Sequence, residues 1–362
     1  MEERIWKWYN SKPWIRGCNF IGSDCANRID QWQSYKCDER FATEDSELNL
    51  AKNTGFNSIR VLIEYDVWDQ EHDNFMANLE RRLALADSNN MTVMMVMSNE
   101  CCVPKEFYKK NQLGEQHYDL GYHGGRKISP HQSGMDTYSI IDEPEIADRY
   151  LEMVKEIITK YKDDERIIAW NLMNEPGNRR KNKSMEFLKR LFKVAREIDP
   201  IQPLAADVWG RVNEDGYPFE REIEVVALEN SDFISFHCYE NFSEVVKRVT
   251  ALKKHNRPIM CTEWLCRVKN NNIHDIFPFF YAEKIGSYHW GLVASYKTQY
   301  FEPYNRIWED FENENIETAH LKVKEWVHDI YRPSHHPYDP TEIKIIKEFT
   351  ALSDREYEKA TK

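Results

Sequence analysis

Short apolar runs alternate with segments of helical periodicity along most of the chain. Eight runs have the length and residue types of buried strands, and they cover 14–21, 57–63, 91–97, 167–172, 203–207, 232–236, 258–262 and 286–292. In the segments between them, apolar residues recur every three or four positions, as at 146–161 and 188–198. Near-continuous apolar strands separated by helices predict a parallel sheet that is covered by helices.

Eight such units favour a closed (β/α)₈ TIM barrel, an α/β fold, over an open doubly wound sheet. The first strand is not followed by G-x-G-x-x-G, and the chain has no Walker motif, which argues against dinucleotide and P-loop folds. We expect a single domain over residues 1–362, with the barrel at about 14–330 and a helical tail at about 333–362. The tail should contain one helix at 342–352, packed on the outside of the barrel.

Two connections are too long for ordinary loops. Residues 99–142 follow the third strand and contain His117, His123 and His131, whereas residues 295–318 follow the eighth strand and are rich in aromatic residues. Both leave the carboxyl ends of strands, the end at which barrel enzymes build their sites. Long loops in that position usually serve binding.

Composition and charge exclude several classes of protein. The 49 basic and 61 acidic residues give a net charge of −12 without a basic run, which argues against nucleic acid as a partner. The sequence has no apolar stretch long enough to span a membrane and no visible signal peptide, so we expect a cytoplasmic protein that does not bind membranes. The eight cysteines lack a C-x-x-C pair, and we expect reduced core thiols, no metal site and no cofactor.

Acidic residues at the ends of buried strands are the strongest sign of chemistry, because a buried charge is costly unless something uses it. Glu175 follows the fourth strand and Glu263 ends the seventh. Three βα units separate these strands at about 29 residues each, close to the roughly 31 expected of a 250-residue barrel. The two carboxylates should therefore face each other at the barrel mouth. Two facing carboxylates are the minimum for hydrolysing a glycosidic bond.

At these residues the chain resembles the clan A retaining glycoside hydrolases, which include the family 5 cellulases and mannanases. The motifs that carry the resemblance are Asn174-Glu175-Pro176 and Thr262-Glu263-Trp264. The whole also looks like a group of cellulase-like bacterial proteins without signal peptides. The resemblance implies that Glu175 is the general acid/base, that Glu263 is the nucleophile, and that Asn174 binds the sugar 2-hydroxyl. It further implies site roles for residues that match three other clan motifs: Arg60 beside the nucleophile, His237 and Tyr239 on strand six, and Trp290 under the sugar.

The third strand departs from the family pattern. Family 5 enzymes usually carry a histidine near its end, whereas here Met97 is followed by Ser-Asn-Glu-Cys-Cys. Within this segment, Glu100 is a candidate substrate contact or an ordinary loop charge. Aromatic residues just beyond strand ends suit a cleft that binds sugar faces, although core packing is the alternative for each. These tryptophans are Trp32, Trp68, Trp209, Trp264 and Trp308.

The expected chemistry makes demands on the two carboxyl groups. A general acid that works near neutral pH needs a raised pKa, and a nucleophile must stay ionised. We therefore expect Arg60 to lower the pKa of Glu263, while burial and the neighbouring negative charge raise the pKa of Glu175.

Together these observations predict a retaining β-glycosidase that hydrolyses oligosaccharides or small glycosides by double displacement. The two long loops favour exo action. The alternatives are a non-catalytic carbohydrate-binding barrel, a metal-dependent hydrolase that uses the loop histidines, and an α-L-arabinofuranosidase or transglycosylase with the same carboxylates. Arg60, His237 and Tyr239 also have purely structural readings, as a buried ion pair, a core histidine and a packing residue. The sequence leaves the sugar, the linkage and the oligomeric state open.

Overall fold

The computed structural model describes residues 2–101, 103–104, 112–116, 137–294 and 325–361. Nine strands form one parallel sheet in the order β7-β6-β3-β2-β1-β11-β10-β9-β8. Their bounds are β1 Arg16–Asn19, β2 Ser58–Leu62, β3 Thr92–Val96, β6 Ile167–Asn171, β7 Leu204–Ala205, β8 Asp207–Val208, β9 Ile234–His237, β10 Ile259–Glu263 and β11 Gly286–Trp290.

The two end strands of this sheet, β7 and β8, together occupy the fifth strand position of the barrel, and this closes the barrel. β7 and β8 are separated by a single residue, Ala206. β7 pairs with β6, and β8 pairs with β9, so the circuit of pairings returns to its start. The nine strands therefore occupy the eight positions of a (β/α)₈ barrel, and each predicted strand is found where the apolar pattern placed it.

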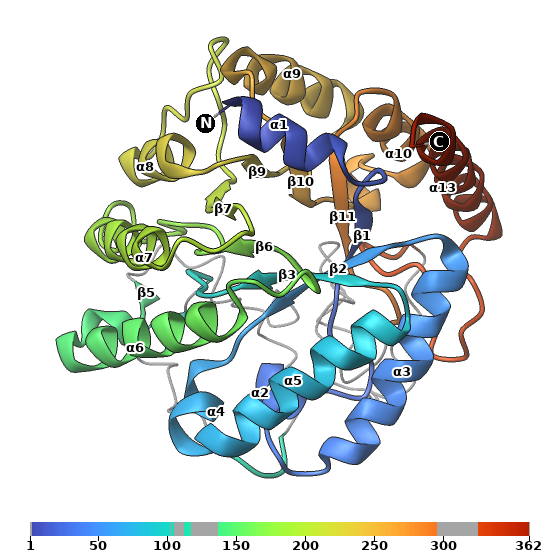
Figure 1. Cartoon of the computed structure of the whole chain (residues 1–362). Helices are drawn as coiled ribbons and strands as arrows, with labels where there is room; N and C mark the ends of the chain where they lie inside the picture. Colours follow the sequence, from blue (N-terminus) through green and yellow to red (C-terminus); the bar gives the residue numbers. More distant parts are fainter. Residues whose placement is uncertain (1, 102, 105–111, 117–136, 295–324, 362) are drawn as a thin grey trace.

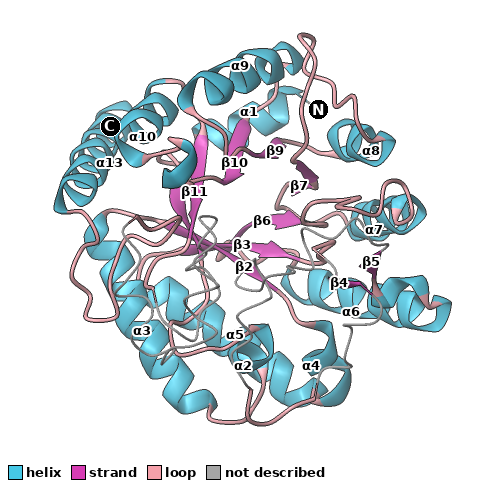
Figure 2. Cartoon of the chain, turned by 180° about the vertical axis from the view of Figure 1, so that it is seen from behind, coloured by secondary structure: helices cyan, strands magenta, loops and turns pink. Residues whose placement is uncertain are grey.

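Helices surround the strands in both views of the molecule (Figures 1 and 2). Predicted helices at 146–161 and 188–198 are confirmed as α6 and α7, and the tail helix α13 is longer than the predicted 342–352. None of the helices in the described part has the length and apolar character of a membrane span. The helices are α1 Glu2–Asn10, α2 Arg28–Trp32, α3 Cys37–Thr54, α4 Tyr65–Gln70, α5 His72–Ser88, α6 Pro144–Tyr161, α7 Met185–Ile198, α8 Glu222–Asn230, α9 Phe242–Leu252, α10 Ile273–Ala282 and α13 Pro340–Ala360.

Helix α1 covers the amino-terminal end of the barrel, an element that the strand pattern did not predict. Trp8 stacks on Phe233, just before β9, and the Tyr9 hydroxyl donates to the backbone carbonyl of Lys284, just before β11. Ile5 and Tyr9 join a core cluster with strand residues that point into the barrel, such as Met260. Since one end of the barrel is closed in this way, the carboxyl ends of the strands are left to form a site.

The tail helix α13 packs against α10 and α3 on the outside of the barrel. Gly55, which ends α3 with a φ of 104°, lies so close to α13 that an added Cβ would sit 2.1 Å from Thr350 Oγ1. The buried Arg16 guanidinium of β1 pairs with Asp354 of α13 at 2.8 Å. A side chain at position 55 would therefore push this helix away from the barrel.

The loop after β3 contains a small antiparallel pair, β4 Val103–Pro104 and β5 Thr137–Tyr138, followed by a 3₁₀ turn at Ile140–Asp142. The three histidines predicted for this loop lie outside the described residues, as does all of 295–318, including Trp308. The seven described cysteines are free thiols, and five of them are buried, which agrees with reduced core cysteines.

Candidate active site

The carboxyl ends of β6, β9 and β10 bring three titratable side chains together. Glu263 is the last residue of β10, His237 is the last residue of β9, and Glu175 lies in the turn after β6. One carboxylate oxygen of Glu175, one of Glu263 and one ring nitrogen of His237 lie within 4.8 Å of one another. Because all strands of the barrel are parallel, side chains from distant parts of the sequence meet at this single end.

Glu263 is held by a cation and a phenol. Its Oε1 accepts a hydrogen bond of 2.8 Å from Arg60 Nη1, and its Oε2 accepts one of 2.8 Å from the Tyr239 hydroxyl. The Arg60 side chain on β2 is completely buried and also donates to Asn19 Oδ1 and Asn174 Oδ1, at 2.7 and 2.6 Å. These contacts fix the Glu263 carboxylate in one orientation while leaving it 6% exposed.

Glu175 is placed by an unusual backbone conformation. Its φ of 47° lies in the left-handed region, which a residue with a long side chain rarely adopts. Its Oε2 accepts hydrogen bonds from Asn178 Nδ2 at 2.6 Å and from the Cys101 thiol at 3.0 Å. Strain of this kind costs about 1–3 kcal/mol and persists where the surroundings enforce it, which is common at functional sites.

His237 lies between three carboxylates. Its Nδ1 is 2.9 Å from Glu175 Oε1 and 3.5 Å from Glu263 Oε2, and its Nε2 is 3.2 Å from Asp207 Oδ2. Burial by itself would lower the pKa of His237, but the attraction of Glu263 and Asp207 outweighs it and raises this pKa to about 10. The ring is therefore an imidazolium at neutral pH.

The pKa directions of the two glutamates are the reverse of those expected from the sequence. Burial acts to raise the pKa of Glu175, but the hydrogen bond and charge of His237 outweigh it and hold this pKa below its usual value. The pKa of Glu263 is raised, mainly because the group is buried, although His237 and Arg60 oppose the rise. The prediction of a raised pKa for Glu175 and a lowered pKa for Glu263 was therefore wrong, because the sequence showed neither how close His237 comes to Glu175 nor how deeply Glu263 is buried.

Other predicted site residues lie around this centre. Asn174 is buried, with its Nδ2 donating to Asn99 Oδ1 at 2.9 Å and its Oδ1 occupied by Arg60. Trp290, at the end of β11, is half-buried. Trp209 is also half-buried beside the turn that carries Glu175, since its Nε1 donates to the Pro176 carbonyl at 3.0 Å.

Two of the predicted substrate contacts are instead buried within the protein. Trp264 is fully buried among core aromatic residues, and its Nε1 donates to Ser287 Oγ at 3.1 Å. Glu100 is 1% exposed and forms an ion pair of 3.1 Å with Arg180. Trp264 directly follows Glu263 at the end of β10, and successive side chains of a strand point to opposite sides, whereas Glu100 is turned inward by its pairing with Arg180. Trp32 and Trp68 are likewise buried in the core.

The sequence analysis missed Asp207, Cys101 and Asn178, the last of which donates to Glu175. Asp207 on β8 is a buried carboxylate at a strand end, the same signal that singled out the two glutamates. Its Oδ2 lies 3.0 Å from Arg60 Nη2 and 3.2 Å from His237 Nε2. Cys101 lies in the segment that departs from the family pattern, and nothing in its surrounding sequence indicates a contact with Glu175.

The Glu175, His237 and Glu263 atoms are also close enough to bind a cation between them. However, the 2.9 Å separation of His237 Nδ1 and Glu175 Oε1 is the length of a hydrogen bond. A shared proton therefore accounts for the arrangement. A metal site formed by the loop histidines is not addressed by the structure, because those histidines lie outside the described residues.

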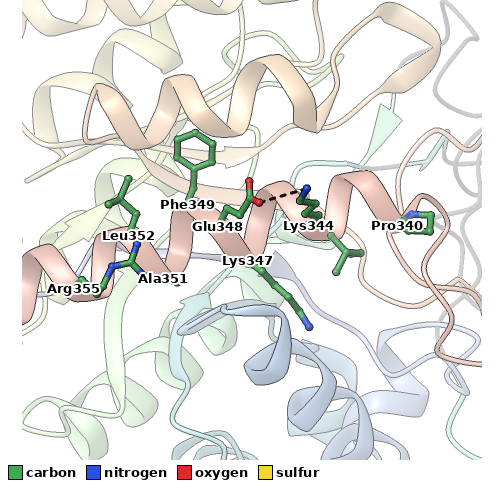
Figure 3. Close-up of a pocket in the computed structure, with 9 residues that line it drawn as sticks. Pro340, Lys344, Lys347, Glu348, Phe349, Ala351, Leu352 and Arg355 are labelled. Atoms are coloured by element: carbon green, nitrogen blue, oxygen red, sulfur yellow. Dashed lines mark ion pairs between the residues drawn. The ribbon is translucent and has the colours of Figure 1, made fainter.

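A surface depression lies far from this centre in sequence and in the fold. It has a volume of about 760 Å³ and is lined entirely by α13, including Lys347, Phe349 and Arg355 (Figure 3). None of its lining residues contacts the three carboxylates, so it is separate from the candidate site.

A closed parallel barrel with two carboxylates facing each other at its carboxyl end defines a barrel-type glycoside hydrolase. Comparison with known families agrees, because the model of the cellulase family, glycosyl hydrolase family 5, matches residues 16–290. The chain belongs to glycosyl hydrolase family 5.

Relatives of this chain include proteins named for mannan. A probable mannan endo-1,4-β-mannosidase C from Aspergillus terreus is 29% identical over 143 residues, which cover 30% of this chain and 34% of that protein. The chain therefore matches about a third of the length of this curated relative.

Solved structures show the same fold at low identity. The β-1,4-mannanase from the sea hare Aplysia kurodai superposes with a TM-score of 0.52 at 14% identity and covers 77% of this chain and 88% of its own. The exo-β-1,4-mannosidase from Opitutaceae bacterium strain TAV5 gives a TM-score of 0.56 at 12% identity and covers 97% of this chain and 61% of its own.

Proposed function

We propose that this family 5 hydrolase is a retaining β-glycosidase in which Glu263 is the nucleophile and Glu175 the general acid/base. The observation that carries the proposal is the short separation of the two carboxylates, since one oxygen of Glu175 and one of Glu263 lie within 4.8 Å of each other. Carboxyl groups about 5–5.5 Å apart are typical of retaining enzymes, whereas inverting enzymes need about 6.5–9.5 Å to admit a water molecule.

The contacts of each glutamate support these roles. Arg60 and Tyr239 leave Glu263 in a fixed orientation, as a nucleophile that must attack along one direction requires. Glu175 shares a proton with His237 through their 2.9 Å contact. When the proton sits on Glu175, this residue can protonate the departing glycosidic oxygen, and the resulting carboxylate can later accept a proton from the attacking water.

The two steps of the reaction then balance. In the first, Glu263 forms a bond to the anomeric carbon as the glycosidic C–O bond breaks, and the proton of Glu175 passes to the leaving oxygen. In the second, water attacks the same carbon, Glu175 takes its proton, and the bond to Glu263 breaks with net retention. Asn174, Trp209 and Trp290 are proposed to bind the sugar.

For the substrate we propose β-linked mannosides of short oligosaccharides. The support is the activity for which the Aspergillus relative and the mannanase and mannosidase structures are named, together with family membership. The cytoplasmic location stays a prediction. Exo action also stays a prediction, since the long loop after the eighth strand, which is part of its basis, lies outside the described residues.

The test is hydrolysis of aryl β-mannoside, β-glucoside, β-galactoside, β-xyloside and α-L-arabinofuranoside, with the first-formed anomer read by proton NMR. We expect the β-mannoside to be cleaved fastest and to release the β-anomer first. Release of the α-anomer first would rule out retention. Preferred cleavage of the arabinofuranoside, or transfer of the sugar to an added alcohol in place of water, would redirect the assignment to those activities.

A further inference from the structure

Asp207 is the third carboxylate of the site and the most deeply buried of the three. Its side chain is completely buried on β8, at the centre of the barrel end. Its Oδ1 accepts hydrogen bonds of 2.5 Å from Asn171 Nδ2 and from the Ser235 hydroxyl. A buried carboxylate is costly unless it is paired and hydrogen-bonded, so this arrangement needs a reason.

The other oxygen of Asp207 meets both cations of the site. Oδ2 lies 3.0 Å from Arg60 Nη2 and 3.2 Å from His237 Nε2. Arg60 in turn contacts Glu263, and His237 contacts Glu175. The same oxygen is 3.4 Å from the backbone N–H of Glu175, the residue with the left-handed backbone. Asp207 Oδ2 therefore contacts both Arg60, which holds Glu263, and His237, which contacts Glu175.

We propose that Asp207 is a positioning residue for the glycosidase reaction: its carboxylate holds the Arg60 guanidinium against Glu263 and holds His237 as an imidazolium against Glu175. The inference rests on the proposed function, because it assigns Asp207 a role in preparing the same two glutamates. Asp207 itself is too deeply buried to touch a substrate, so its action passes through Arg60 and His237.

The charge balance explains why a third carboxylate is needed. Two glutamates and two cations would leave the site without net charge. The imidazolium of His237 would then lose its proton to Glu175 or to solvent more readily. The added negative charge of Asp207 favours the protonated ring, and the effects of Asp207 and Glu263 together raise the pKa of His237. Asp207 itself stays ionised, because His237, Arg60 and its hydrogen bonds outweigh burial and lower its pKa.

The groups around His237 define what a pH profile would report. Those that face the ring are the three carboxylates, which come from β8, β10 and the turn after β6. Further groups act at one remove: Arg60 of β2 and Tyr239 contact these carboxylates, Cys101 contacts Glu175, and Arg248 of α9 donates to the backbone carbonyl of His237.

The decisive variant is Asp207→Asn, which keeps the size of the side chain and removes its charge. Loss of this charge lowers the pKa of His237, so the proton shared with Glu175 is lost at lower pH. We expect the alkaline limb of kcat/KM to move down by about one pH unit or more. We also expect kcat to fall by about 10²-fold, because Arg60 and His237 lose their fixed positions, while KM changes little.

Ser235→Ala is the matched control, since it removes one neutral donor from Oδ1 and leaves the charge in place. It should lower the thermal midpoint without moving the alkaline limb. If Asp207→Asn loses stability but keeps the wild-type limb, Asp207 is merely structural and the proposal fails. The proposal also fails if Ser235→Ala moves the limb as far as Asp207→Asn.

Nitrogen NMR of histidine-labelled wild type gives a readout that needs neither turnover nor the Asp207→Asn variant. The His237 signal, assigned by its loss in His237→Gln, should show an imidazolium up to pH 8, and a neutral ring at pH 7 overturns the inference. If His237 is charged but the wild type cleaves no glycoside, the proposed function fails while the Asp207 arrangement stands. If glycosides are cleaved with an unmoved limb in Asp207→Asn, only the role of Asp207 fails.

Discussion

His237 Nδ1 lies 2.9 Å from Glu175 Oε1, which is the distance of a hydrogen bond. The imidazolium is favoured, since the pKa of His237 is raised while that of Glu175 is lowered. A glycosidic oxygen that displaces this contact would remove the influence that keeps Glu175 ionised. In the proposed mechanism, substrate binding prepares Glu175 as the general acid, so this residue does not need a raised pKa beforehand.

Removing the acid/base side chain should separate the two chemical steps. For Glu175→Ala, we expect kcat/KM to fall by about 10²–10⁴-fold on glycosides with poor leaving groups, and far less on activated aryl glycosides that need no protonation. Steady-state kinetics over a series of phenols of different pKa checks this. Asn178→Ala, which removes only a donor to Glu175, is the control and should keep the wild-type dependence on the leaving group. Equal losses on all leaving groups would contradict the assignment.

The thiol of Cys101 should lower the pKa of Glu175. Its hydrogen bond favours the carboxylate, so Cys101→Ala should raise the pKa of Glu175 and keep it protonated to higher pH. The alkaline limb of kcat/KM is then expected to move up, in the direction opposite to that of Asp207→Asn. Cys101→Ser retains a donor and should stay near the wild-type profile. A limb that moves down in Cys101→Ala would show that the thiol does not stabilise the ionised acid.

Trp290 at the end of β11 and Trp264 directly after β10 should behave differently on substitution. Trp290→Ala is expected to raise KM by about tenfold, the equivalent of roughly 1.4 kcal/mol of lost ring contact with the sugar, with little change in stability. Trp264→Phe is expected to lower stability by about 1–3 kcal/mol with KM unchanged, because the indole is buried and bonded to Ser287. Kinetics and urea unfolding of both variants decide this, and a reversed pattern would assign the sugar platform to Trp264.

The tail helix should stabilise the barrel through one buried ion pair. Arg267 donates to Glu342 Oε1 at 2.9 Å and to its Oε2 at 2.6 Å, and both side chains are buried. Glu342→Ala removes the carboxylate partner of this buried guanidinium, which then keeps only its hydrogen bonds to backbone carbonyls, and should cost about 3–5 kcal/mol in urea unfolding. Glu348→Ala, on the same helix but in an exposed pair with Lys344, should cost about 0.5 kcal/mol or less. Similar losses in the two variants would mean that burial of the pair does not matter.

The sequence was sufficient to predict the barrel because its strands are buried on both sides and carry continuous apolar runs. It did not predict α1, in which only Ile5 and Tyr9 are buried, because two buried positions form no clear pattern until the barrel end that they cover is known. The split of the fifth strand at Ala206 was also hidden, since its two pieces together look like one short run.

The site residues that could be predicted are those whose buried charge has a high free-energy cost. Contacts that depend on three-dimensional geometry could not be predicted. Glu175 and Glu263 stand out because acidic residues at the ends of buried strands need a reason, and Asp207 carries the same signal. The contacts of Cys101 and the pKa directions depend on distances of about 3 Å between side chains from different strands, which no local pattern encodes. Adjacency in sequence misled the reading of Glu100 and Trp264, whose side chains point into the protein.

The most direct test of the account is the variant Glu263→Ala assayed with an activated aryl β-mannoside, with and without azide. We predict no turnover without azide, because no other group can form the glycosyl-enzyme, and recovery of aryl release with azide as an α-mannosyl azide of inverted configuration. Asp329→Asn, a buried carboxyl outside the site, should hydrolyse as the wild type does and need no azide. Turnover by Glu263→Ala without azide, with retained configuration, would contradict the assignment of Glu263 as the nucleophile.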